Sequence, residues 1–228
     1  MYWDYSGGQV TNIGQHSLDV VDWILGVDDC RAVYSTGGRF ALDAEGETPD
    51  TQDALFTWDN WTASFSLREA AVGASRAPGL EFCGTRGSLT LSRSGFRLTG
   101  DPEIPPENQI PQFTGDHPVG GPRPLPGSGT PEPRTPPRED SSGSGDEQFV
   151  AHARNFLDCV RSRETPVSDL ESGHRVAGLC HLANLSLRLG RLLRWDAGTE
   201  TVRDDPEANG MLTRTYRAPW DRELAALG

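Results

Sequence analysis

The sequence predicts an α+β fold in which a mostly antiparallel, open sheet carries its helices on one face. Short runs rich in Val, Phe, Trp, Leu and Thr alternate with turn residues over the first hundred positions. Several connections between these runs are two to four residues long, too short for a crossover helix, which favours antiparallel pairing. Segments of helical periodicity stand before and after the runs.

The first expected element is a helix over residues 11–25. Ile13, Val20 and Ile24 recur at helical spacing, so we expect them to form the apolar stripe of this helix. Gly26 is expected to end it. Six strands should follow, over residues 30–40, 51–59, 61–69, 79–84, 88–92 and 96–99.

Residues 101–145 hold 12 of the 17 prolines and few large apolar side chains. Such a segment buries too little surface to offset its ordering entropy, so we expect a long, largely mobile surface loop rather than an interdomain linker. On this interpretation residues 1–228 form a single domain interrupted by the loop.

Helical periodicity returns in the second half of the chain. A helix is expected over residues 146–163, with Phe149, Phe156, Leu157 and Val160 on one side. A second helix over residues 170–189 is apolar on most faces and should be buried against the sheet and a partner helix. An edge strand over 192–195, a short helix over 206–212 and an irregular tail complete the prediction.

Composition excludes several classes of partner. The net charge is −12, which argues against nucleic acid and anionic membranes because both attract basic surfaces. No 18 apolar residues run together and the N-terminus lacks a signal peptide, so a cytoplasmic location is expected unless upstream sequence carries an export signal. The four cysteines have no metal-binding spacing and are expected to be reduced thiols, with no metal site.

The residues best suited to chemistry lie in the first 26 positions. In an ideal helix Asn12, His16 and Asp19 share one face. An imidazole placed there suits proton exchange with a substrate hydroxyl, although the spacing alone favours a solvent-facing histidine without function. Trp3 and Tyr5 are candidate walls for a sugar ring.

The segment 7–26 reads Gly-Gly-Gln-x-Thr-Asn-x-Gly-x-His-x-x-Asp-x-x-x-Trp-x-Leu-Gly. This pattern resembles the start of the C-terminal domain of the glucose-fructose oxidoreductase / inositol dehydrogenase (Gfo/Idh/MocA) family, of bacterial type. Ordered similarities follow over residues 35–51, 79–96, 155–166, 171–196 and 207–220.

The resemblance implies a glyceraldehyde-3-phosphate-dehydrogenase-like sheet that also mediates homo-oligomer contacts. It implies that His16 is the catalytic histidine, and that Asn12 stands where dehydrogenases of the family often have aspartate. Asn12 would then orient the substrate, and Trp3, Tyr5, Gln9 and Asp19 are the expected substrate contacts.

Family members bind NAD(P) in an N-terminal Rossmann domain that carries a Glu-Lys-Pro motif. This sequence has no GxGxxG motif and no lysine, so we expect that domain to be absent, lost upstream or supplied by a separate chain. The chain alone is then expected to bind no cofactor and to be inactive. Two functions stay open: the substrate part of an NAD(P)-dependent oxidoreductase acting on a sugar, cyclitol or glycoside hydroxyl, or a non-catalytic carbohydrate-binding or oligomerisation module.

Overall fold

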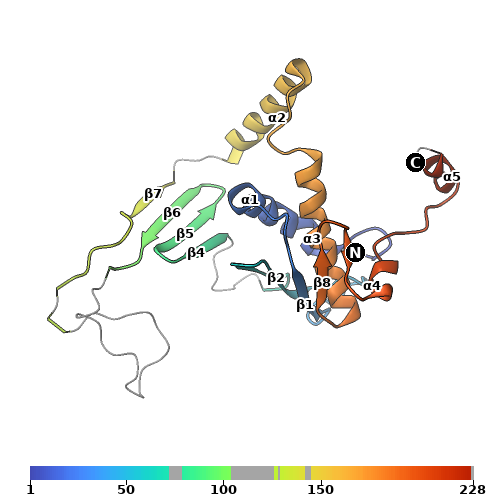
Figure 1. The fold of residues 1–228 in the computed structure, drawn as a ribbon, viewed down its shortest axis with the longest axis horizontal. Helices are drawn as coiled ribbons and strands as arrows, with labels where there is room; N and C mark the ends of the chain where they lie inside the picture. The colour runs from blue at the N-terminus through green and yellow to red at the C-terminus, as the bar shows by residue number, and fades with distance from the viewer. Residues whose placement is uncertain (72–78, 104–125, 128, 142–144, 227–228) are drawn as a thin grey trace. The chain divides into compact units, whose positions relative to one another are not determined.

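The computed structural model describes residues 1–71, 79–103, 126–127, 129–141 and 145–226 (Figure 1). The chain folds into two compact units. Unit 1 comprises Met1–Ala74 and Val167–Gly228, and unit 2 comprises Ser75–Pro166. That residues 1–228 form a single domain stays a prediction.

Unit 1 is built on a five-stranded sheet with the order β3-β2-β1-β8-β9, and every pairing in it is antiparallel. The strands expected over 30–40, 51–59 and 61–69 are confirmed. The strand expected at the edge, β8, instead lies between β1 and a short strand that periodicity could not reveal. The bounds are β1 Ala32–Gly38, β2 Thr51–Thr57, β3 Thr62–Arg68, β8 Leu193–Asp196 and β9 Thr201–Val202.

One face of this sheet is buried and the other is open. Along β2 the side chains of Gln52, Ala54 and Phe56 are buried, whereas Leu55 between them is 45% exposed. Since successive side chains of a strand point to opposite faces, the alternation identifies the covered face. The predicted sheet with helices on one face is therefore confirmed for this unit.

Helix α3 (Leu170–Leu189) covers the buried face and contacts β1 and α1 (Figure 1). The Asp169 carboxylate accepts a hydrogen bond from the Ser172 N–H and caps the start of the helix. Gly190, with φ of 67°, ends it in the left-handed conformation. The expected burial of this helix on several faces is confirmed, and the helix packed against it is α1.

The helix expected over 11–25 forms as a π-helical turn, η1 (Val10–Gly14), followed by α1 (Gln15–Leu25). The predicted apolar stripe is wrong. Val10, Leu18 and Val21 face the core, while Ile13 is 51% exposed. Apolar residues occur on two faces of this segment, so periodicity alone could not identify the face that packs on α3.

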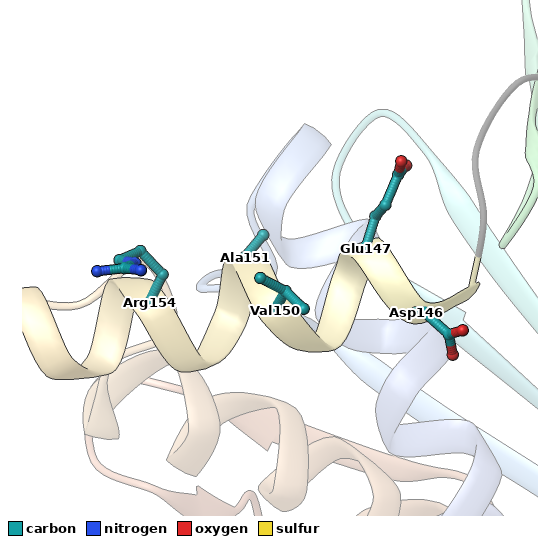
Figure 2. A pocket seen from close by; sticks show the side chains of 5 residues that line it. All are labelled: Asp146, Glu147, Val150, Ala151 and Arg154. Atoms are coloured by element: carbon teal, nitrogen blue, oxygen red, sulfur yellow. The ribbon is translucent and has the colours of Figure 1, made fainter.

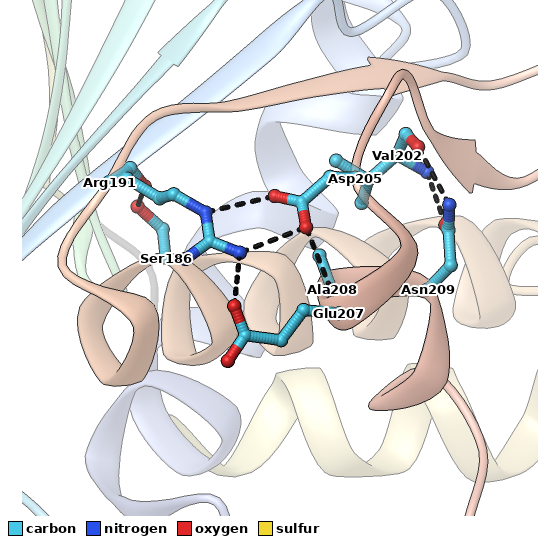
Figure 3. A network of polar contacts seen from close by, with 7 residues as sticks. All are labelled: Ser186, Arg191, Val202, Asp205, Glu207, Ala208 and Asn209. Carbon is cyan, nitrogen blue, oxygen red and sulfur yellow. Dashed lines mark hydrogen bonds and ion pairs between the residues drawn. The ribbon is translucent and has the colours of Figure 1, made fainter.

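A charged cluster secures the end of α3 to α4 (Pro206–Gly210), as Figure 3 shows. The Arg191 guanidinium donates to both carboxylate oxygens of Asp205 at 2.9 Å and to Glu207 at 2.7 Å. Asp205 also caps α4 by accepting from the Ala208 N–H. The short helix predicted over 206–212 is thus confirmed, but the tail beyond it also contains a helix, α5 (Trp220–Ala225), where an irregular segment was expected.

Unit 2 contains an antiparallel sheet with the order β4-β5-β6-β7 and helix α2 (Gly145–Ser162). The three strands predicted over 79–99 and the helix predicted over 146–163 are confirmed. β7 lies inside the segment 101–145, so part of the expected loop is a strand that pairs with β6. The mobility predicted for this loop falls mainly on residues outside the described part of the chain. The strands are β4 Leu80–Gly84, β5 Gly87–Ser92, β6 Gly95–Gly100 and β7 Arg138–Asp140.

Within the described ranges, no helix combines the length and the apolar character needed to cross a lipid bilayer.

Candidate functional site

His16 is the second residue of α1, and its side chain is exposed. Asn12 is exposed in η1, and Asp19 is half-buried in α1. A π-helical turn places its side chains differently from an α-helix, so the ideal spacing assumed for Asn12 and His16 does not hold. Among the described residues the structure shows no hydrogen bond that joins these three side chains. The imidazole is therefore not held between the amide and the carboxylate.

Asn12 instead belongs to a chain of polar contacts that ends at the sheet. The Asn12 Nδ2 donates to Gln9 Oε1 at 3.2 Å, and the Gln9 Nε2 donates to Glu69 Oε1 at 3.0 Å. The predicted contacts Gln9 and Asn12 are thus brought together. Asn12 Oδ1 accepts no hydrogen bond from the described residues, so it can accept one from a hydroxyl group. Glu69 follows the last residue of β3, and no local sequence signal connected it to the first ten residues.

The glycine pair before Gln9 forms the turn that starts this segment. Gly8 has φ of +70°, and a Cβ atom at this residue would lie 2.9 Å from the Cβ of Thr48. The Thr11 hydroxyl donates to the Gly8 carbonyl at 2.9 Å. Both the backbone conformation and the close approach of Thr48 therefore require glycine at this position.

The predicted aromatic walls are each approached by an arginine. The guanidinium carbon of Arg188 lies 5.3 Å from the Trp3 ring centroid, and that of Arg217 lies 5.6 Å from the Tyr5 ring centroid. These distances suit cation–π attraction. Trp3 is half-buried and Tyr5 is exposed, and neither lines the hollow described next. The arginines were missed because they lie far from the two aromatic residues in sequence.

Figure 2 shows a shallow hollow that belongs to α2 in unit 2. Its lining residues all come from this one exposed helix, and the Asp146 and Glu147 carboxylates point in different directions. A ligand site normally needs polar groups that converge on one point. The hollow includes none of the predicted site residues, and we assign it no function.

No group of three or more metal-ligating side chains is found within the described residues. All four cysteines are free thiols. Burial raises the pKa of Cys30 to about 11 and that of Cys180 to about 12. These two thiols stay protonated near neutral pH and are poor nucleophiles.

Comparison with known families places both ends of the chain in one group of enzymes. Residues 1–90 match the model described as the GFO/IDH/MocA C-terminal domain. Residues 146–222 match the model described as the C-terminal alpha/beta domain of an oxidoreductase family. No curated protein matches this sequence.

Solved oxidoreductase structures share the fold. An oxidoreductase from Agrobacterium radiobacter in complex with NAD⁺, L-tartaric acid and magnesium is 21% identical, with a TM-score of 0.53 over 84% of this chain and 50% of that one. An NAD-binding protein from Listeria innocua is 18% identical, with a TM-score of 0.53 over 82% and 51%. Levoglucosan dehydrogenase in complex with NADH and levoglucosan is 13% identical, with a TM-score of 0.54 over 80% and 49%.

The chain spans about half the length of each of these structures. Its antiparallel sheet, its covering helices and the two family matches agree with the resemblance found in the sequence. The chain belongs to the Gfo/Idh/MocA family of oxidoreductases and has the fold of that family's C-terminal domain.

Proposed function

We propose that this chain is the substrate-binding part of an NAD(P)-dependent oxidoreductase that acts on a hydroxyl group of a sugar, cyclitol or glycoside. The observation that carries the proposal is the exposed His16 imidazole in the first turn of α1, directly after the Glu69–Gln9–Asn12 contacts. Levoglucosan dehydrogenase, which has this fold, was solved with NADH and a sugar derivative, and this supports the substrate class.

In the proposed reaction His16 accepts the proton of the substrate hydroxyl as the alcohol is oxidised, and returns it in the reverse direction. An exposed imidazole is suited to this role because its ring nitrogens can either accept or donate a proton. Asn12 cannot exchange a proton, so we assign it the orientation of the hydroxyl through its Oδ1 atom, which accepts no hydrogen bond from the described residues, while its Nδ2 donates to Gln9. We keep Trp3, Tyr5 and Asp19 as proposed substrate contacts.

The residues that the structure describes do not fit a dinucleotide. Every strand pairing in the described part of the chain is antiparallel, whereas the nucleotide site of a Rossmann fold follows a parallel strand through a glycine-rich turn. The sequence also contains no GxGxxG motif and no lysine. We therefore propose that NAD(P), which would take up the hydride, is held by another domain or by a separate Rossmann chain.

The test combines this chain with a nucleotide-binding domain of the family, fused or as a separate polypeptide, and measures NAD(P)H formation with a panel of sugars and cyclitols. His16→Ala should lower kcat by about 100-fold or more, as expected for loss of a general base. His152→Ala is the matched control, since His152 is also exposed but lies on α2 in unit 2. Equal turnover of the His16 variant and the parent would remove His16 from the mechanism.

The open face of the sheet supports a second candidate, a module that assembles copies of this chain without catalysis. Tyr34 on β1 and Leu55 on β2 occupy this face and are both exposed. Exposed apolar side chains on one face favour self-association. Sedimentation of the parent chain and of Leu55→Glu would test it: loss of a dimer or larger species in the variant supports assembly through this face, and a monomeric parent excludes it.

A further inference from the structure

We infer that Asn184 is a positioning residue that fixes the Gly7–Gly8 turn, and through it the Gln9–Asn12 pair, by a chain of hydrogen bonds with only one allowed direction. The hydrogen bonds are seen directly in the structure, whereas their consequence for catalysis rests on the proposed function. Asn184 lies on α3, far from the turn in sequence.

The chain of hydrogen bonds begins in the core between the sheet and α3. Gln52 on β2 is fully buried, and Asn184 is 4% exposed. The Gln52 Nε2 donates to Ser35 Oγ on β1 at 3.1 Å and to Asn184 Oδ1 at 3.4 Å. The Asn184 Nδ2 then donates to the Gly7 carbonyl at 2.6 Å. Buried amides thus connect two strands and a helix to the turn.

The Gly7 carbonyl determines the orientation of both amides. A carbonyl oxygen only accepts, so Asn184 must present its Nδ2 to Gly7 and its Oδ1 to Gln52. Gln52 must then present its Nε2, and Ser35, which accepts from Gln52, donates to the Asp53 carbonyl at 3.0 Å. Reversing either amide would oppose two oxygens or two donors.

This arrangement leaves Gln52 Oε1 buried without a hydrogen-bond partner among the residues that the structure describes. An unpaired buried acceptor lowers stability, and an apolar side chain of similar size would fill the same space without that loss. Core packing alone would not need an amide at Gln52. We therefore infer that the amide N–H groups of Gln52 and Asn184 are kept because they hold the turn in position.

The turn transmits this position to the candidate site. A Cβ atom on Gly7 would lie 2.6 Å from Thr11 Oγ1 and 3.0 Å from Asn184 Nδ2, so Gly7 packs closely against both of these side chains. Gly8 approaches Thr48 closely as well. Gln9 follows directly; it accepts a hydrogen bond from the Asn12 amide and donates one to Glu69. Release of the Gly7 carbonyl should loosen this whole segment.

The test is hydrogen exchange on the full chain, comparing wild type with Asn184→Asp. The carboxylate keeps the shape of the amide but has no donor for Gly7. At pH 7, protection of the amides of residues 8–16 should fall at least about fivefold, as for one lost hydrogen bond, while α3 and β1 keep their protection. When the carboxyl group is protonated at lower pH it can donate again, so the ratio of variant to wild-type protection should recover.

Asn184→Ser provides the uncharged comparison and serves if the aspartate variant does not fold. Its shorter side chain should also release residues 8–16, but the loss should not change with pH. Protection of residues 8–16 equal to wild type in both variants, or an equal loss across α3 and β1, would overturn the inference. No catalytic activity is needed for this measurement, so failure of the proposed function would leave its result unaffected.

Discussion

The neighbouring residues Leu192 and Leu193 allow a sharp test of the core of unit 1. Leu193 is fully buried on β8, opposite Val33 of β1, whereas Leu192 is 50% exposed. Replacing either by alanine removes the same atoms at adjacent positions. The largest difference between the two positions is the burial of the side chain that is removed.

Leu193→Ala removes a buried side chain and leaves a cavity that the surrounding side chains fill only partly. Such changes lower the free energy of unfolding by about 3 kcal/mol. For a chain of this size, that loss should lower the midpoint of thermal unfolding by roughly 6–12 °C. Leu192→Ala removes a half-exposed side chain and should cost less than about 1 kcal/mol.

Tryptophan fluorescence in a urea titration measures this difference cleanly, because all six tryptophans lie within the residues of unit 1. The shift of the urea midpoint at constant slope gives the change in the free energy of unfolding. If the two alanine variants differ by less than about 0.5 kcal/mol, a value typical of surface substitutions, the assignment of Leu193 to the buried core is refuted.

Three further predictions concern thiols, pH and the cofactor. An aromatic disulfide reagent at pH 8 should leave Cys30 and Cys180 unmodified until denaturant is added, because burial keeps these thiols protonated, whereas the exposed Cys83 should react at once; modification of all four without denaturant would contradict this. Asp50 accepts hydrogen bonds from three backbone N–H groups of residues 40–42, which holds the pKa of its carboxyl well below its usual range, so its stabilising effect is complete above about pH 4 and fades as the pH falls further. Asp50→Asn should therefore lose stability at pH 7 and approach wild type in strong acid, and an equal deficit at pH 7 and pH 3 would contradict the assignment. Calorimetry of the chain with NADH should show no binding, and tight binding would place a dinucleotide site within these residues.

Strand positions could be predicted because short runs of β-forming residues between turn residues depend on local chemistry. The antiparallel pairing of β2 with β3 follows from a connection too short for any other path. The inward face of the segment formed by η1 and α1 could not be predicted in the same way, since Ile13 and Leu18 are both apolar and only packing on α3 selects Leu18. β7 was missed because strand pairing with β6 outweighs a proline-rich composition.

For the candidate site, too, some features follow from the sequence and others only from the tertiary structure. By itself, the sequence determined which groups are available: a histidine suited to proton exchange, an amide in place of an acid, a glycine turn, and neither lysine nor a GxGxxG motif. Tertiary structure alone decided their partners, because Glu69 and Asn184 reach Gln9 and Gly7 only after the sheet and α3 have packed. Hydrogen bonds between residues this distant depend on the path of the whole chain, and no local pattern records that path.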